Sequence, residues 1–252
     1  MRIQVSVMLR VQPSTNSNDQ LSDNSLIEID QRKNQISFLQ PNSTPAARGV
    51  VDSTGGVVQQ QPPPCQPKFF AFDNIFSPEE RHDRISSGSL LDVLHAVING
   101  GDGALLTYGG PNTGKTRTMV GTDASGGVTS GILPCAIAWL YSLIDDCKQR
   151  TGARISVRVS AVEVVGRKEE LRDLLYEQAP ACTDSIDDSH SHASPGIYLR
   201  EDVTGGINLE NVSEPQAATK DKAGFYLDAA LASRSSGKFY FITCFPFAKI
   251  LF

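Results

Sequence analysis

The chain lacks most of the features that mark specialised classes of protein. Only 5 of its 252 residues are cysteine and none forms a C-x-x-C pair, which excludes a paired-cysteine zinc site and a disulfide framework. With 23 basic against 28 acidic side chains, the net charge of −5 argues against binding to nucleic acid. No apolar run reaches the roughly 20 residues of a membrane helix, and the interrupted N-terminus does not match a signal peptide. We therefore expect a cytoplasmic protein with reduced thiols and no membrane partner.

The chain has the composition of a globular domain, because 40% hydrophobic and 20% charged residues are enough to build a core and a solvated surface. Two segments differ from this composition. Residues 41–67 are rich in Pro, Gln and Gly, residues 177–195 are polar and acidic, and we expect both to be loops. The second loop contains a short cluster of acidic and imidazole side chains: Asp187, Asp188, His190 and His192. In an unpatterned polar stretch such a cluster is better interpreted as a solvated loop than as a metal site.

Hydrophobic periodicity predicts strands that alternate with helices. Period-two alternation indicates a strand, and apolar residues at i, i+3, i+4 and i+7 indicate a helix. The expected strands are residues 3–11, a hairpin at 26–39, residues 104–108, residues 155–165 and a strand-rich stretch at 197–212. The expected helices are residues 89–98, a helix that starts at Pro134, a short helix at 171–175 and residues 219–233. This alternation predicts an α/β fold with three layers around a sheet.

One motif carries specific chemistry, because GGPNTGKT matches G-x-x-x-x-G-K-[ST] in full. It comprises Gly109, Gly110, Pro111, Asn112, Thr113, Gly114, Lys115 and Thr116. The glycines let backbone N–H groups turn inward around a phosphate. We expect Lys115 to reach the β- and γ-phosphates of a nucleotide, and the Thr116 hydroxyl to bind its Mg²⁺ ion. Pro111 removes one N–H donor and stiffens the loop, so the strength of binding is a separate question.

The residues around this loop resemble those of kinesin motor domains. TYGGPNTGKTRTMVG is similar to the kinesin phosphate-binding loop, which an aromatic-Gly pair enters and T-x-T-M-x-G leaves. Similar segments occur in the family's order: VSVMLRVQP, FAFDNIF, LLDVLHAVINGGDGALLTYG, GILPCAIAWLYSLI and SAVEVVGRKEELRDLL. The resemblance covers nearly all of residues 1–234, which we interpret as a partial kinesin motor domain. It implies a three-layer P-loop NTPase fold of the kinesin type, with a mixed central β-sheet that is incomplete at its C-terminal side, and ATP with Mg²⁺ as ligands.

The resemblance implies further nucleotide contacts near the N-terminus. VSVMLRVQP is similar to the family's first strand, which ends in R-x-R-P, and in kinesins the second Arg and the Pro hold the adenine. Arg10, Gln12 and Pro13 stand at these positions, so Gln12 replaces an arginine and lowers the expectation of base binding. Segments such as GIYLREDVTGGINLENVSE and AGFYLDAALASRS look most like a divergent, unconventional branch of the family. Members of that branch are thought to bind microtubules without hydrolysing ATP, and to act in cell signalling and cell shape.

The family motifs that support hydrolysis do not follow in this sequence. In kinesins the helix that resembles residues 219–233 leads into N-x-x-S-S-R-S-H, and D-x-A-G-x-E comes later; this chain reads SSGKFYFITCFPFAKILF instead. Because phosphoryl transfer needs an oriented water and stabilised charge, we expect no hydrolysis at a motor's rate and assign no catalytic residue. The resemblance implies microtubules as the partner of full-length relatives and a location on the cytoskeleton. LREDVTGGINLENV carries one basic residue, Arg200, so we expect weak or no microtubule binding by this chain alone.

The sequence leaves two questions open. The chain is either an ATP-binding motor-domain fragment or a nucleotide-independent scaffold for cytoskeletal or signalling partners; a small-metabolite kinase is disfavoured because no Arg-rich lid is visible. The apolar tail, residues 235–252, is an edge strand that completes the sheet, a stub that touches a membrane, or sequence from outside the family. The abrupt loss of resemblance after Arg234 favours the last of these interpretations.

Overall fold

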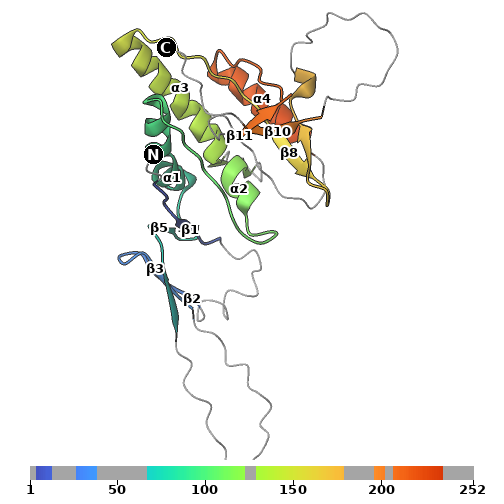
Figure 1. The fold of residues 1–252 in the computed structure, drawn as a ribbon. Helices are drawn as coiled ribbons and strands as arrows, with labels where there is room; N and C mark the ends of the chain where they lie inside the picture. The colour runs from blue at the N-terminus through green and yellow to red at the C-terminus, as the bar shows by residue number, and fades with distance from the viewer. Residues whose placement is uncertain are drawn as a thin grey trace, which may run out of the picture. The chain divides into compact units, whose positions relative to one another are not determined.

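The computed structural model describes residues 4–12, 27–38, 67–122, 129–178, 196–201 and 207–234 (Figure 1). The chain divides into two compact units: the first is Met1–Gly88 with Gly110–Gly114, and the second is Ser89–Gly109 with Lys115–Phe252. Several predictions lie outside the described residues and stay predictions: Pro13, the loops at 41–66 and 179–195 with their Asp and His cluster, and the tail at 235–252.

The N-terminal strand of the first unit is confirmed, but it is shorter than predicted. β1 (Met8–Arg10) pairs in parallel with β5 (Asn74–Phe76). Ile75 and Phe76 are buried on β5, whereas Val5, at the start of the predicted strand, is exposed. The ladder therefore covers only the part of the predicted strand that has a partner and a core to pack on.

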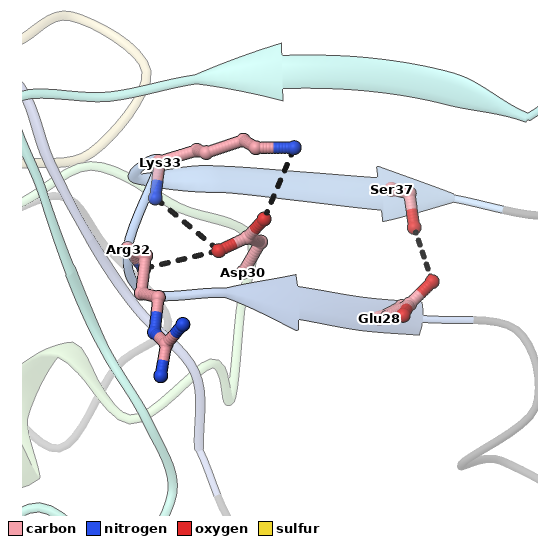
Figure 2. Close-up of polar contacts among 5 residues, drawn as sticks. All are labelled: Glu28, Asp30, Arg32, Lys33 and Ser37. Carbon is pink, nitrogen blue, oxygen red and sulfur yellow. Dashed lines mark hydrogen bonds and ion pairs between the residues drawn. The ribbon is translucent and has the colours of Figure 1, made fainter.

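The predicted hairpin at residues 26–39 is present, and a carboxylate closes its turn. The hairpin belongs to a three-stranded antiparallel sheet of β2 (Ile27–Asp30), β3 (Gln35–Phe38) and β4 (Lys68–Ala71). The Asp30 carboxylate accepts hydrogen bonds from the backbone N–H groups of Arg32 at 3.0 Å and Lys33 at 3.2 Å (Figure 2). The Lys33 ammonium lies 3.7 Å from the second Asp30 oxygen. These contacts stabilise the turn and thereby fix the register of the two strands.

The first helix begins earlier than predicted. α1 (His82–Ile98) starts at His82 rather than Ser89, and it ends at the expected residue. Its buried apolar side chains recur at the spacing of one helix face: Ile85, Leu90, Leu94 and Val97. Ile85 extends this buried face upstream, so Ser89 lies inside the helix and not at its start.

Three helices belong to the second unit beyond Gly109: α2 (Lys115–Val120), α3 (Ile132–Thr151) and α4 (Lys220–Ala232). Between the first two, β6 (Gly121–Thr122) pairs with β7 (Thr129–Ser130). The long helix α3 contacts both α2 and α4 (Figure 1). The predictions for both α3 and α4 are confirmed. Pro134 lies in the first turn of α3. Helix α4 begins after an N-cap at Thr219, whose side chain accepts a hydrogen bond from the Lys222 N–H.

One predicted helix of the second unit is wrong. The sequence predicts a short helix at residues 171–175, but β9 (Glu170–Asp173) pairs antiparallel with β8 (Val162–Val165). Pairing with β8 satisfies the backbone and buries the side chains at the end of β9, and this tertiary gain outweighs a local helix preference. A short 3₁₀ helix (Tyr176–Gln178) follows.

The remaining strands of the second unit match the predictions in part. β10 (Tyr198–Glu201) and β11 (Ile207–Glu210) form the expected antiparallel hairpin. The predicted strand at 155–165 has β8 as its C-terminal part, and its upstream part pairs with residues 215–217 around an isolated bridge between Arg158 and Gln216. The described strands thus pair into five small sheets.

The predicted strand before the phosphate-binding motif is wrong. Residues 104–108 pair with none of the segments that the structure describes, and Leu106 and Tyr108 are exposed. A β-prone sequence becomes a strand only where another strand supplies hydrogen-bond partners. The α/β fold class is therefore confirmed by the helices and sheets present, whereas the single mixed central sheet in three layers stays a prediction. Among the described residues, no helix has both the length and the apolarity to cross a bilayer.

Candidate nucleotide-binding site

The middle of the phosphate-binding motif, Gly110–Gly114, belongs to the first unit and adopts a loop that glycine and asparagine favour. Asn112 has a φ of 59° and Gly114 a φ of 82°, both in the left-handed region. The Thr113 hydroxyl donates to the Gly110 carbonyl at 2.9 Å and holds the loop closed on itself. Pro111, Asn112 and Thr113 are exposed, so the loop is open to solvent.

The end of the motif opens a helix. Lys115 is the first residue of α2, and its ammonium donates to the Gly109 carbonyl at 2.9 Å. The ammonium is therefore held at the backbone of Gly109, the first residue of the motif. Thr116 is exposed, so its hydroxyl is accessible to a metal ion carried by a nucleotide.

Of the residues predicted near the N-terminus, Gln12 lies at the loop. A Cβ atom placed on Gly114 would lie 2.6 Å from Cδ and 2.7 Å from Nε2 of Gln12, so the Gln12 amide packs directly on the last glycine of the motif. This close approach and the positive φ leave no room for a side chain at residue 114. Arg10, in contrast, has a guanidinium nitrogen 3.3 Å from Nε2 of His82, a neighbour that the sequence did not indicate.

Two buried carboxylates were missed as structural groups by the sequence analysis. Asp173 accepts hydrogen bonds from the backbone N–H groups of Leu175 at 2.8 Å and Ser213 at 2.7 Å. Glu163, which is 2% exposed, lies 3.8 Å from the guanidinium of Arg172. Only Glu163 gives a sequence signal, because it is an acidic residue inside the apolar stretch at 161–165, whereas Asp173 follows the charged residues KEELR.

Neither carboxylate lies in a metal-ligand cluster of the residues that the structure describes. No group of three or more His, Cys, Asp or Glu side chains is arranged to hold a metal within the described ranges. Cys135 and Cys147 are free thiols, and the reduced state of the cysteines stays a prediction. The motif at 109–116 is thus the part of the described structure with recognisable ligand chemistry.

Comparison with known proteins identifies the family of the chain. The sequence profile described as "Kinesin motor domain" matches residues 10–240. Since this match covers most of the chain, the chain belongs to the kinesin motor domain family, whose members have a P-loop NTPase-like α/β fold.

Similar relatives carry names of kinesin-like proteins. The chain is 43% identical over 234 residues to "Kinesin-like protein KIF26A" of Mus musculus, which covers 93% of this chain and 12% of that protein. It is 44% identical over 232 residues to "Kinesin-like protein KIF26B" of Homo sapiens, covering 92% and 10% respectively. "Kinesin-like protein CG14535" of Drosophila melanogaster is 36% identical over 248 residues, covering 92% and 20%. The chain therefore spans between 10% and 20% of the length of these relatives.

Proposed function

We propose that this chain is the nucleotide-binding part of a kinesin-like protein that associates with microtubules, and that residues 109–116 bind Mg-ATP. The observation that supports the proposal is the complete motif, in which Lys115 opens α2 and its ammonium lies 2.9 Å from the Gly109 carbonyl. A nucleotide phosphate offers this ammonium stronger, charged acceptors than a neutral carbonyl.

Each residue of the proposed site has a separate task. Lys115 neutralises phosphate charge, and the backbone N–H groups of the loop, except at Pro111, donate to phosphate oxygens. Thr116 supplies a hydroxyl ligand to Mg²⁺, the ion that bridges the phosphates when nucleotide is bound. Gln12 packs on Gly114 and therefore positions the loop from the side. We assign no residue to the hydrolysis of ATP.

Titration of the chain with a fluorescent ATP analogue in the presence of Mg²⁺ tests this site. Lys115→Ala removes a charge-assisted contact with phosphate and should weaken binding by about tenfold or more. The matched control is Lys148→Ala, an exposed lysine in the last turn of α3. Equal affinity of the two variants, or no binding to the unaltered chain at millimolar nucleotide, would contradict the proposal.

Thr116→Ala separates the metal from the phosphate contribution. This variant should lose much of the increase in affinity that Mg²⁺ gives, while binding in EDTA stays close to that of the unaltered chain. Thr107→Ala, an exposed threonine outside the motif, is the control. If both threonine variants respond to Mg²⁺ alike, Thr116 does not bind the ion.

A second candidate function, a nucleotide-independent scaffold, is favoured by two features of the loop. Pro111 lacks an N–H donor for a phosphate. Gln12, which packs beside Gly114, stands at a position where the resemblance implies an arginine. Binding of partners that is identical with and without Mg-ATP, together with no measurable nucleotide affinity, would select the scaffold.

Microtubule binding by this chain alone should be weak. Arg200, the basic residue of the β10–β11 hairpin, already forms an ion pair with Glu210 at 3.4 Å, so little positive charge remains there for an acidic surface. Cosedimentation with microtubules at low and at physiological salt measures this property. Salt-sensitive binding with a micromolar dissociation constant would contradict the expectation.

A further inference from the structure

A cavity of about 450 Å³ lies in the second unit, between the start of β9 and the start of β10. Two segments of the chain form its wall: Glu169, Glu170, Leu171, Gly196, Ile197 and Leu199. Ligand pockets in proteins measure roughly 300–1,000 Å³, so this cavity is large enough to take up side chains of a partner. No residue of the motif at 109–116 lines it, so it is distinct from the proposed nucleotide site.

The apolar part of the wall is incompletely covered. Ile197 and Leu199 are two residues apart, which is the spacing at which the side chains of a strand share one face. Ile197 is buried, whereas Leu199 is 63% exposed. Leu209 of β11 lies opposite Leu199 in the register, so the apolar face continues beyond the cavity. An exposed apolar face of this shape suits an elongated partner, such as a peptide segment, better than a compact small molecule.

The charged part of the wall is acidic. Glu169 and Glu170 are exposed, and no Lys or Arg of the described residues lines the cavity. Arg172 of β9 and Arg200 of β10 each form an ion pair with a carboxylate outside the wall, at 3.8 Å and 3.4 Å. The nearest basic side chains on the two strands are therefore engaged elsewhere, and the wall attracts cations.

The turn between β8 and β9 positions the first of these carboxylates. Gly166 has a φ of 73° and Glu169 a φ of 54°, and the Glu169 N–H donates to the Gly166 carbonyl at 3.4 Å. Arg167 and Lys168 lie within this turn and are exposed, but they do not line the cavity. Among the described residues, the charges on the wall are thus those of the two glutamates.

We propose that this cavity binds a peptide segment of a partner protein in which a Lys or Arg lies next to an aliphatic or aromatic side chain. The apolar side chain fills the cavity against Leu171, Ile197 and Leu199. The neighbouring cation pairs with the carboxylates of Glu169 and Glu170. The proposal does not depend on nucleotide binding, because it uses none of residues 109–116.

The charge of the wall selects against two other occupants. The chain's own segment at residues 179–195, which precedes Gly196, contains three aspartates and no Lys or Arg: Asp184, Asp187 and Asp188. It therefore offers no complementary charge. An acidic partner surface, such as that of a microtubule, is repelled by the same two carboxylates.

Fluorescence anisotropy of the intact chain with a labelled octapeptide of alternating arginine and leucine tests the proposal. We expect binding in the micromolar range. An octapeptide of alternating glutamate and leucine, and one of alternating arginine and serine, should each bind about tenfold more weakly, because each lacks half of the required chemistry. Equal binding of either control peptide, or no binding of the arginine–leucine peptide at millimolar concentration, would overturn the proposal.

Two pairs of variants with equal change in net charge locate the acidic contact. Glu169→Gln combined with Glu170→Gln should weaken binding of the arginine–leucine peptide by about tenfold. Glu177→Gln combined with Glu214→Gln changes exposed residues outside the wall and should leave affinity within about twofold. Equal weakening by both pairs would show that the peptide responds only to net charge, and the proposal would fail.

A side chain at Gly196 should block the cavity. A Cβ atom at this position would meet no other atom within 4 Å, and the residue has no positive φ, so the fold accepts a larger residue there. Gly196→Leu should abolish peptide binding, whereas Gly224→Leu, at a similarly open glycine of α4, should not. Unchanged binding by Gly196→Leu would contradict the proposed site.

Nuclear magnetic resonance of the unaltered, labelled chain gives a readout that needs no variant. The arginine–leucine peptide should shift the backbone amide resonances of Gly196, Ile197 and Leu199. Shifts confined to other residues would overturn the proposal.

Discussion

Two segments of the second unit have similar strand-like sequences, but only one of them has backbone partners among the described residues. Residues 155–165 end in β8 and make an isolated bridge at Arg158, and Val157, Val159 and Val162 are buried. Residues 104–108 carry a comparable apolar run, yet Leu106 is 83% exposed and the segment pairs with no described strand. The difference lies in the partners, because residues 215–217 and β9 supply hydrogen bonds to the first segment. Strand propensity alone therefore does not make a strand.

The partners of residues 155–165 are held in place by a few polar contacts. The Asp173 carboxylate joins the end of β9 to Ser213, just upstream of residues 215–217. From the other side, the Tyr141 hydroxyl of α3 donates to the Ala217 carbonyl at 2.6 Å. These two contacts fix the partner segment against the strand, and residues 104–108 have no such arrangement among the described residues.

The largest effect should follow from removing the carboxylate of Asp173. Asp173→Ala leaves the N–H groups of Leu175 and Ser213 without their acceptor, and should lower the free energy of unfolding by about 3 kcal/mol. Asp145→Ala, at an exposed position of α3, is the matched control and should change stability by less than about 0.5 kcal/mol. Urea denaturation measures both, and equal effects would show that Asp173 does not hold the partner segment.

A second prediction compares the two segments directly. Val159→Ala creates a cavity at a buried residue and should cost about 2 kcal/mol, whereas Leu106→Ala at an exposed residue should cost less than about 0.5 kcal/mol. The midpoints and slopes of urea unfolding give both values. A cost at Leu106 as large as that at Val159 would show that residues 104–108 are covered after all.

The sequence predicted the elements that depend on local signals. The hairpin at 26–39, the helix ends near Ile98 and Thr219, and the phosphate-binding motif all rest on turn, cap or glycine chemistry within a few residues. The failures are those that depend on distant partners: 171–175 is a strand because β8 lies beside it, and 104–108 is not one because no partner does. The contact of Gln12 with Gly114 likewise joins residues far apart in sequence, and only the predicted role of Gln12 near the nucleotide pointed to it.

A smaller effect should follow from removing the Tyr141 hydroxyl. Tyr141→Phe deletes the hydrogen bond to Ala217 and should lower the free energy of unfolding by about 1 kcal/mol. Tyr176→Phe, which alters a more exposed tyrosine, should be nearly neutral. Thermal or urea unfolding at neutral pH checks the difference, and equal stability of the two variants would contradict the role of Tyr141.

The same hydroxyl gives a pH dependence of known sign. Burial raises the pKa of Tyr141 from 10.0 to about 12, so the protonated phenol is the form that the fold stabilises. Its contribution is complete below pH 10 and is lost as the pH rises toward 12. The stability difference between the unaltered chain and Tyr141→Phe should therefore shrink across this window. A difference that grows with pH would contradict the assignment.

The most direct test of the whole account is amide hydrogen exchange of the intact chain with and without Mg-ATP. The account predicts that Mg-ATP slows exchange at residues 109–116 by about tenfold or more and leaves the Val159 amide, which is hydrogen-bonded to the Pro215 carbonyl, unchanged. Lys115→Ala should abolish the change at residues 109–116. Exchange at residues 109–116 that does not respond to Mg-ATP, in a chain that is otherwise folded, would contradict the proposed nucleotide site.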